Sequence, residues 1–284
     1  MAKHLRLGIL ILIALSIVLL RPSGLASQPP SESAHDLIKD VVYNELQDRG
    51  RQSFWEYRIE KRIAQQNVTE EQVETQYGPV YRVIAKNGVP LDQAQQQHDD
   101  SRLDALLHDP GEQEKLKNNY EKDEQRLERL MALLPDAFVC EYDVQDGSNI
   151  RLKFRPNPSF NPPTYEARIF HGLAGQMWID PQHKRLVALK GELVDRVEFG
   201  YGLLGHIDKG GVFAIHRQQV STTHWKTDLI DIHVSGRVLL FKTVDKEQYE
   251  VRSGFRAVSE SMTLEQAQAL LKETAVTMSE LEHD

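Results

Sequence analysis

The sequence predicts an α+β protein built on a large antiparallel β-sheet. Many short runs alternate apolar and charged residues, which is typical of strands with one covered and one solvated face. Helical spacing of apolar residues occurs only near the start, in the middle and near the end of the chain. Because strands and helices do not alternate, the sheet is expected to be antiparallel. The pattern gives about eleven to twelve strands.

The N-terminal residues have the order of a secretory signal peptide. Lys3 and Arg6 precede an unbroken apolar run, Leu7–Leu20, and small residues follow it up to Ala26. The run is short for a bilayer core, which needs about 20 residues. We therefore expect a signal peptide over 1–26 that is cleaved near Ala26, with an uncleaved anchor as the alternative. The protein is then periplasmic or secreted.

The residues after this leader have the pattern of a helix followed by a three-stranded meander. Apolar residues recur at helical spacing over 34–48, with Glu45 on the same stripe, and such a stripe must lie on another element. The period changes to two over 55–63 and, more weakly, over 73–77 and 81–85. These three strands are expected to pair as an antiparallel meander, and the Asn87-Gly88 pair that follows them is a favourable turn.

A charged, Gln-rich segment, 91–134, then interrupts the strands. Asp109 is expected to cap a helix with Pro110 in its first position, which divides the segment into two helices. The apolar stripe of the second helix is too short for sustained coiled-coil heptads. The segment is therefore interpreted as a two-helix insert packed across the sheet, with a coiled-coil helix as the alternative.

Strand patterns dominate from Asn149 to Arg256. The first run covers 150–154, and the apolar parity changes between Leu229 and Ile230, which suggests a β-bulge. Further runs begin near Tyr165, Gln176, Leu186, Arg196, Val212, His224, Arg237 and Glu247. Turn signals lie at Asp180-Pro181, Asp208–Gly211 and Ser235-Gly236.

The last element is expected to be a helix. Thr263 and Gln266 have the spacing of a capping box, in which each side chain satisfies the backbone N–H of the other residue. An apolar stripe that includes Leu270 and Leu271 follows. The helix should therefore begin at about this box and lie on the sheet.

Composition narrows the classes of function. Lys and Arg total 34 against 42 Asp and Glu, for a net charge of −8, which argues against a nucleic-acid partner. Cys140 is the only cysteine, so no intrachain disulfide is available, and its apolar neighbours suggest a buried, inert thiol. No phosphate-binding glycine loop or serine-nucleophile motif occurs. We expect no cofactor, and the absence of these motifs favours a binding protein over an enzyme.

The eleven histidines do not form a metal motif. None has the helical spacing of a His pair that ligates a metal, and none lies two residues from another on a strand. His216, His224 and His233 could meet on neighbouring strands, but exposed strand histidines are the more common case. No metal site is predicted.

One segment resembles a known family. Gly175 to Leu193 is similar to part of the outer-membrane lipoprotein-sorting (LolA/LolB-like) superfamily, in which a strand ending in Trp-Ile-Asp turns sharply into the next strand. The match is carried by Gly175, Trp178, Asp180, Pro181 and Leu186. Downstream, 213–215, Trp225 and 234–241 resemble the later strands of the same sheet.

The resemblance implies a curved, incomplete β-barrel whose apolar concave face is partly covered by helices and binds acyl chains of lipids or lipoproteins. It also implies a single half-barrel domain over 27–284 that contains the helical insert 91–134. Alternating strands place one set of apolar residues on a common interior. The candidate cavity residues are Trp55, Tyr57, Ile59, Phe154, Ile169, Met177, Ile179, Phe199, Phe213, Ile215 and Trp225. The alternative is that they fill a solid core.

Three functional hypotheses follow. The first is an exported, non-enzymatic carrier or sensor for lipid or lipoprotein acyl chains, with an envelope membrane protein as a second candidate partner. The second is an envelope interaction scaffold that uses the 91–134 helices for contact. The third is a hydrolase in which His216 and His233 share a cleft with a carboxylate. The first predicts an apolar cavity above the roughly 300 Å³ typical of ligand sites.

Overall fold

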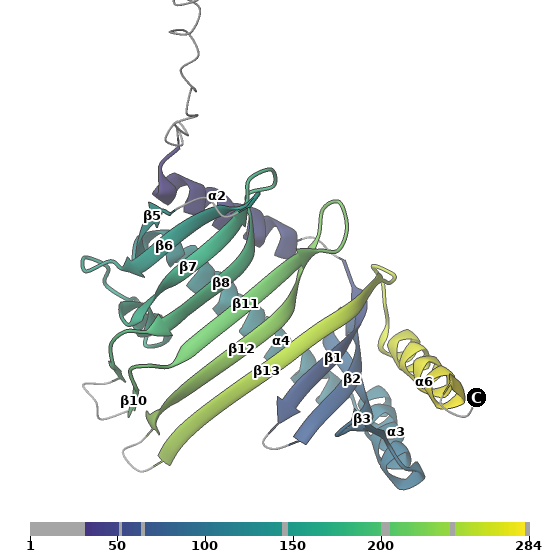
Figure 1. Cartoon of the computed structure of the whole chain (residues 1–284). Helices are drawn as coiled ribbons and strands as arrows, with labels where there is room; N and C mark the ends of the chain where they lie inside the picture. Colours follow the sequence, from purple (N-terminus) through teal and green to yellow (C-terminus); the bar gives the residue numbers. More distant parts are fainter. Residues whose placement is uncertain are drawn as a thin grey trace, which may run out of the picture. The chain divides into compact units, whose positions relative to one another are not determined.

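The computed structural model describes residues 32–50, 53–63, 66–143, 147–199, 205–238 and 242–281 (Figure 1). The chain divides into two compact units, 1–33 and 34–284, and the second contains every element described below. The predicted signal peptide, 1–26, lies outside the described residues. Among the helices that are described, none is long and apolar enough to span a membrane.

The predicted α+β class and antiparallel sheet are confirmed. Thirteen strands form one sheet, in the order β4-β3-β2-β1-β13-β12-β11-β8-β7-β6-β5, with β9 and β10 attached through β12. Its edge strands do not pair with each other, so the sheet is not closed into a barrel. The strands are β1 Trp55–Ile63, β2 Gln66–Thr75, β3 Gly78–Lys86, β4 Val89–Pro90, β5 Phe138–Tyr142, β6 Ile150–Pro156, β7 Leu173–Asp180, β8 Arg185–Leu193, β9 Val197–Phe199, β10 Gly205–Ile207, β11 Val212–Gln219, β12 Trp225–Val238 and β13 Lys242–Ala257.

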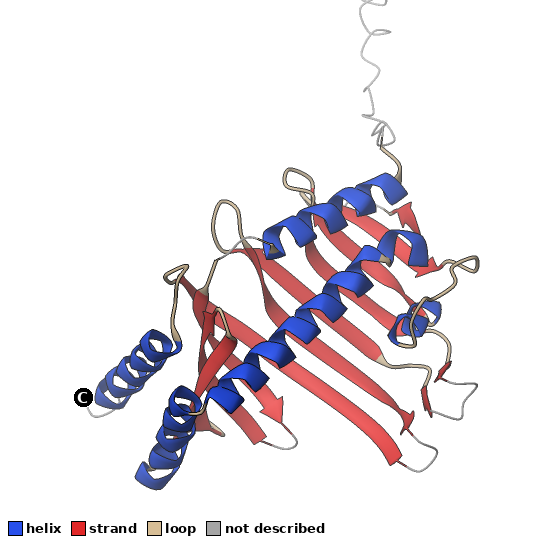
Figure 2. Cartoon of the chain, turned by 180° about the vertical axis from the view of Figure 1, so that it is seen from behind, coloured by secondary structure: helices blue, strands red, loops and turns tan. Residues whose placement is uncertain are grey.

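Helices lie across one face of this sheet, which we call the covered face (Figure 2). Helix α2 and the long helix α4 both cross it, and Figure 1 shows the opposite, open face. The helices are α2 Ala34–Arg49, α3 Gln93–His108, α4 Pro110–Ala132, α5 Leu134–Ala137, the 3₁₀ helix η1 Glu166–His171 and α6 Leu264–Leu281.

Helix α2 forms where the apolar spacing predicts it, and its stripe is buried. Leu37 and Ile38 pack with Leu152 and Ile179 of the sheet in the largest buried cluster. The helix ends before Gly50, whose N–H donates to the carbonyl of Leu46 at 3.1 Å. Burial of this stripe holds α2 on strands β5 to β8.

The insert 91–134 forms two helices, α3 and α4, as predicted. The carboxylate of Asp109 accepts from the backbone N–H groups of Gly111 and Glu112, with Pro110 in the first turn. Leu103 of α3 is only 1% exposed and packs with Val73 of β2 in a second cluster. The insert is therefore part of the folded core rather than an appendage.

Helix α6 completes this second cluster. The capping box is present, since Gln266 N–H donates to the hydroxyl of Thr263 and Thr263 N–H donates to the side chain of Gln266. Leu264 and Leu271 are buried against the same group as Leu103. The terminal helix therefore fixes the β1–β3 end of the sheet together with the insert.

Two predictions were wrong. The strand expected to begin near Tyr165 does not form there; the 3₁₀ helix η1 takes its place, because Ala167 and Phe170, three residues apart, point into the core. Ser235-Gly236 is not a turn but lies within β12. A Cβ on Gly236 would lie 2.3 Å from the carbonyl oxygen of His206. The glycine allows β10 to approach β12 closely. In the sequence alone, a glycine required for such a close approach looks the same as a glycine in a turn.

The predicted bulge is present, one residue from the expected position. On β11 and β12, His216 pairs with Leu229 and Arg217 pairs with Thr227, so Asp228 is the extra residue. A bulge shifts the side-chain alternation of one strand. The parity change in the sequence therefore reported a real irregularity of the sheet.

The paired glycines of β7 and β8 give a test of the fold. Gly175 lies opposite Gly191, and a Cβ on Gly175 would lie 2.1 Å from the carbonyl oxygen of Lys190. We expect Gly175→Ala to lower the free energy of unfolding by about 1–3 kcal/mol, because backbone atoms must move. Urea denaturation measures this loss.

Gly50→Ala is the matched control, since its Cβ would meet no atom closer than 3.6 Å. The control should be close to neutral. Equal stability of the two variants would contradict the close approach of β7 and β8.

Candidate functional site

A buried ion cluster joins the end of helix α2 to the sheet. The guanidinium of Arg185 on β8 donates through Nε to Glu45 Oε1 at 2.9 Å and through Nη2 to Glu45 Oε2 at 3.0 Å. The same guanidinium also donates to Asp48, and Arg217 of β11 donates to Glu45. Glu45 and Asp48 lie one helical turn apart, so both carboxylates face the sheet.

Backbone groups complete the cluster. The N–H of Leu186 donates to Glu45 at 3.1 Å, and the N–H of Trp225 donates to Asp48 Oδ2 at 3.1 Å. Burial alone would lower the pKa of Arg185, but the hydrogen bonds and charges of Glu45 and Asp48 raise it. The hydrogen bonds between these two carboxylates and two guanidiniums fix α2 to β8, β11 and β12.

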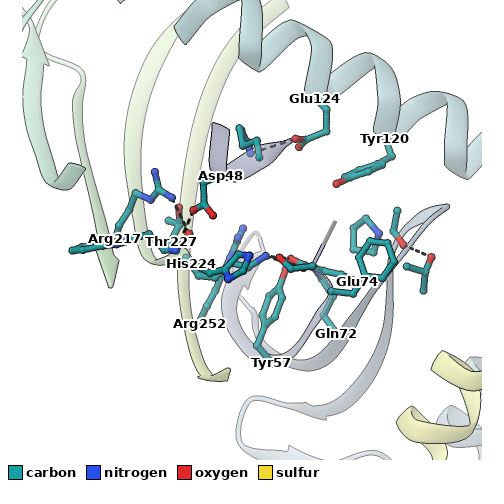
Figure 3. Close-up of a pocket in the computed structure, with 18 of the residues that line it drawn as sticks. Asp48, Tyr57, Gln72, Glu74, Tyr120, Glu124, Arg217, His224, Thr227 and Arg252 are labelled. Atoms are coloured by element: carbon teal, nitrogen blue, oxygen red, sulfur yellow. Dashed lines mark hydrogen bonds and ion pairs between the residues drawn. The ribbon is translucent and has the colours of Figure 1, made fainter. Parts of the chain in front are cut away.

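A cavity of about 520 Å³ lies beside this cluster (Figure 3). Helix α4 lies over it, while strands β1, β2, β3, β11, β12 and β13 and the end of α2 supply the other walls. Its size is within the range of small-molecule sites. The lining residues are Asp48, Arg49, Gly50, Ser53, Phe54, Tyr57, Gln72, Glu74, Thr75, Gly78, Pro79, Tyr120, Glu124, Arg217, His224, Trp225, Lys226, Thr227 and Arg252.

Helix α4 is attached at its ends and spans the cavity between them. Leu116 packs against the cluster of β2, β3 and α6, and Leu130 packs against the cluster of α2. Between these ends Tyr120 and Glu124 project towards the cavity (Figure 3), and Glu124 forms an ion pair with Arg49 at 3.3 Å. No residue of α4 is buried, so little packing energy holds its middle in place.

Four side chains of the lining keep a buried polar atom that has no hydrogen-bond partner among the described residues. They are Asp48 Oδ1, Arg217 Nε, His224 Nε2 and Arg252 Nε. An unpaired buried polar atom costs about 1–3 kcal/mol, so such atoms are uncommon in folded proteins. Their concentration around one cavity is what a polar ligand would satisfy.

The hydrogen bonds around His224 indicate which ring nitrogen carries its proton. The hydroxyl of Ser221 accepts from the backbone N–H of His224 at 3.2 Å and lies 3.0 Å from Nδ1 of the ring. That hydroxyl also accepts from the backbone N–H of Thr223 at 3.4 Å, so both of its lone pairs are used and its own proton is directed to Nδ1. Nε2 then carries the ring hydrogen and is a donor.

Charges around the cavity are balanced. Lys226 pairs with Glu74 at 2.8 Å and Arg252 pairs with Glu250 at 2.8 Å. The charged lining residues are balanced only together with their ion-pair partners Glu45, Arg185 and Glu250, which lie outside the lining; the set then has five cations and five anions. The cations are Arg49, Arg185, Arg217, Lys226 and Arg252, and the anions are Glu45, Asp48, Glu74, Glu124 and Glu250.

Two tyrosines of the lining remain protonated. Burial, reinforced by Glu74, raises the pKa of Tyr57 far above its usual range. Burial, reinforced by Glu124, raises the pKa of Tyr120 to about 12. Both hydroxyls are therefore neutral hydrogen-bonding groups at neutral pH.

The eleven predicted cavity residues do not line one common space. Tyr57 and Trp225 line the 520 Å³ cavity, and Phe154 borders a separate depression of about 360 Å³ on β5, β6 and β7. Phe154, Met177 and Ile179 are buried in the α2 cluster. Their proposed role in lipid binding stays a prediction.

The other candidates lie in three different places. Ile169 and Phe213 pack at the border of the α2 cluster, while Trp55 and Ile59 belong with Tyr57 to a third buried cluster. Phe199 is half-buried on β9, outside these clusters. Ile215, on β11, is also half-buried and outside all three.

The charged residues of the cavity were not predicted. One signal was present, because Glu45 lies on the apolar stripe of α2, and a carboxylate on a buried stripe needs a partner. Its partner Arg185 is 140 residues away in the chain. No local pattern connects two such positions.

The histidines proposed for a hydrolase lie on the open face. His216 Nδ1 is 2.6 Å from Asp228, and His233 Nε2 is 2.7 Å from Asp231. His216 alternates with Arg217, which faces the covered side, and His233 pairs with Val212, four residues from His216. The two histidines thus do not meet in a cleft. Across the described ranges, no group of three or more His, Cys, Asp or Glu residues could hold a metal ion.

The fold and the cavity define an open-sheet α+β protein with a ligand-sized, charge-balanced cavity beneath a crossing helix. Comparison of the chain with family models, with curated proteins and with solved structures gave no match.

The ion cluster predicts a large stability effect. We expect Arg185→Met to lower the free energy of unfolding by about 3–5 kcal/mol, because two buried carboxylates lose a partner. Arg155→Met is the control: its guanidinium is 57% exposed and lies 3.7 Å from Glu141, so the loss should stay below about 1 kcal/mol. Urea denaturation measures the free energy of unfolding of both variants. Equally small losses in the two variants would mean that the cluster does not hold α2.

Cys140 gives a pH-dependent prediction. Burial raises the pKa of its thiol to about 11, so at pH 8 the reactive thiolate should be about 100-fold rarer than for a thiol with the ordinary value near 9. Alkylation by iodoacetamide, followed by mass spectrometry, should be slower by that factor in the native protein than in urea. The native rate should rise tenfold per pH unit up to about pH 11. A native rate that levels off near pH 9 would contradict the burial.

Proposed function

We propose that this protein binds an amphipathic lipid, or the acyl chain of a lipoprotein, between helix α4 and the covered face of the sheet, as a carrier or sensor outside the cytoplasm. The observation that supports this most directly is that two features lie next to each other on the covered face: the polar cavity and a strip of half-buried aliphatic side chains. The strip belongs to none of the three buried clusters.

The strip consists of Ile215, Ile230 and Ile232. Ile215 lies on the same side of β11 as Arg217 and is two residues away, about 7 Å along a strand. Ile230 is paired with Ile215, and Ile232 is paired with Phe213, so all of them share the covered face. An acyl chain on this strip would bury apolar area while its polar end lies in the cavity.

The attachment of α4 supports entry of such a ligand. Its middle is held by the Arg49–Glu124 and Arg126–Glu166 pairs rather than by buried side chains, and a partly exposed ion pair contributes at most about 1 kcal/mol. Movement of this segment would widen the cavity without disrupting the two clusters that hold its ends. A site that opens in this way suits a ligand that must enter sideways.

The sequence expectations agree with this proposal. The predicted signal peptide would deliver the chain to the compartment in which lipoproteins travel, and the Gly175–Leu193 segment resembles lipoprotein-sorting proteins. The polar lining differs from the apolar cavity that the sequence predicts. The ligand we propose is therefore amphipathic, with its polar end as well as its chain in contact with protein.

Native mass spectrometry tests the proposal. The chain from Ser27 onwards, purified without detergent after export, should carry extra mass equal to one or two lipids, which is lost on organic extraction. Ile215→Glu should abolish this mass, because a charge on the strip repels an acyl chain. Val212→Glu is the matched control on the same strand, since Val212 is 45% exposed and faces the opposite side.

Thermal melting of both variants separates a loss of binding from a loss of folding. A bare mass that stays bare after incubation with envelope lipids would contradict the proposal. It would favour the interaction scaffold, for which the partly exposed Tyr120 and Leu127 of α4 are the available contact surface.

A further inference from the structure

The chemistry of the cavity indicates which polar group it takes. We propose that it binds the neutral, hydroxylated head group of an amphiphile, a sugar or another polyol, in preference to a phosphate or a carboxylate. This inference rests on the proposed function, since it assigns the polar end of the same ligand.

Charge balance is the first argument. Each guanidinium and ammonium of the site already has a carboxylate partner, and the cations equal the anions in number. An anionic head group would add an uncompensated charge to a partly buried site, which is costly. A neutral head group leaves the balance unchanged.

The unpaired polar atoms are the second argument. Arg217 Nε, Arg252 Nε and His224 Nε2 are donors, whereas Asp48 Oδ1 is an acceptor. A hydroxyl accepts and donates at once, so a group with several hydroxyls can satisfy both kinds of atom. A phosphate or carboxylate accepts only, and it would be repelled by Asp48, whose side chain is only 7% exposed.

The rest of the lining fits the same chemistry. Ser53 and Thr227 supply hydroxyl groups that can donate to a ligand hydroxyl, whereas the side chains of Gln72 and Thr75 are already hydrogen-bonded within the protein. Aromatic side chains stand among them and offer flat apolar faces to the C–H groups of a sugar ring. These are Phe54, Tyr57, Tyr120 and Trp225.

Three amphiphiles that share one chain length test the inference. n-Octyl-β-D-glucoside, octanoate and n-octyl phosphate are titrated below their micellar concentrations into the chain from Ser27 onwards. Isothermal calorimetry gives the dissociation constants, and Trp225 provides a fluorescence signal from the cavity wall. We expect the glucoside to bind at least about tenfold more tightly than the other two.

A conservative variant separates head-group recognition from general stability. Arg252→Lys keeps the positive charge beside Glu250 but removes the Nε–H group, so it should weaken glucoside binding about tenfold and leave octanoate unchanged. Arg62→Lys is the matched control, because Arg62 lies over the ring of Tyr249 and is exposed on the other side of β1. It should change neither constant.

The outcomes distinguish this inference from the proposed function. Octanoate or n-octyl phosphate binding as tightly as the glucoside would overturn the head-group assignment and leave acyl binding in place. The same holds if Arg252→Lys and Arg62→Lys behave alike towards the glucoside. Failure of all three amphiphiles to bind would overturn the proposed function together with the inference.

Discussion

The cluster of Glu45, Asp48, Arg185 and Arg217 is the interaction on which the site depends. It is the only place described where one helix contributes two buried carboxylates to three strands of the sheet. Buried charges are stable only as a complete set, because each partner that is lost leaves an uncompensated charge. The cluster therefore fixes α2 in one position. In doing so it places Arg217 and the backbone of Trp225 at the wall of the cavity.

The same helix end also controls the cover of the cavity. Arg49 follows Asp48 directly and pairs with Glu124 in the middle of α4, so the fixed end of α2 supplies the contact that holds the crossing helix closed. The two clusters at the ends of α4 do not depend on this pair. The protein thus combines a wall made by buried ions with a crossing helix whose middle is held by the partly exposed ion pairs Arg49–Glu124 and Arg126–Glu166. This arrangement separates stability of the fold from access to the site.

Local signals in the sequence were sufficient for the helices and for most strands. The stripe of α2, the cap at Asp109 and the capping box at Thr263 each depend on residues within one or two turns, which is why they could be read without the structure. The pairing of β1 with β13 could not be predicted in this way, because the paired residues are far apart in the chain. Glu56, for example, lies opposite Arg256, 200 positions later. The turn predicted at Gly236 was wrong for a related reason. The residue that requires a glycine there, His206, lies on another strand and is distant in the sequence.

The same distinction explains the difference between the predicted and observed cavity. Alternation tells which residues share a face but not what lies opposite them. On the covered face, α2 and the β5–β8 strands close over Phe154, Met177 and Ile179 to make a solid core, whereas at the level of Arg217 the ion cluster interrupts the apolar surface. Ile215 lies on β11 between Phe213, at the border of that core, and Arg217, and it is half-buried. The polar cavity and the aliphatic strip are therefore neighbours on the covered face, and a ligand that fits both must itself be amphipathic.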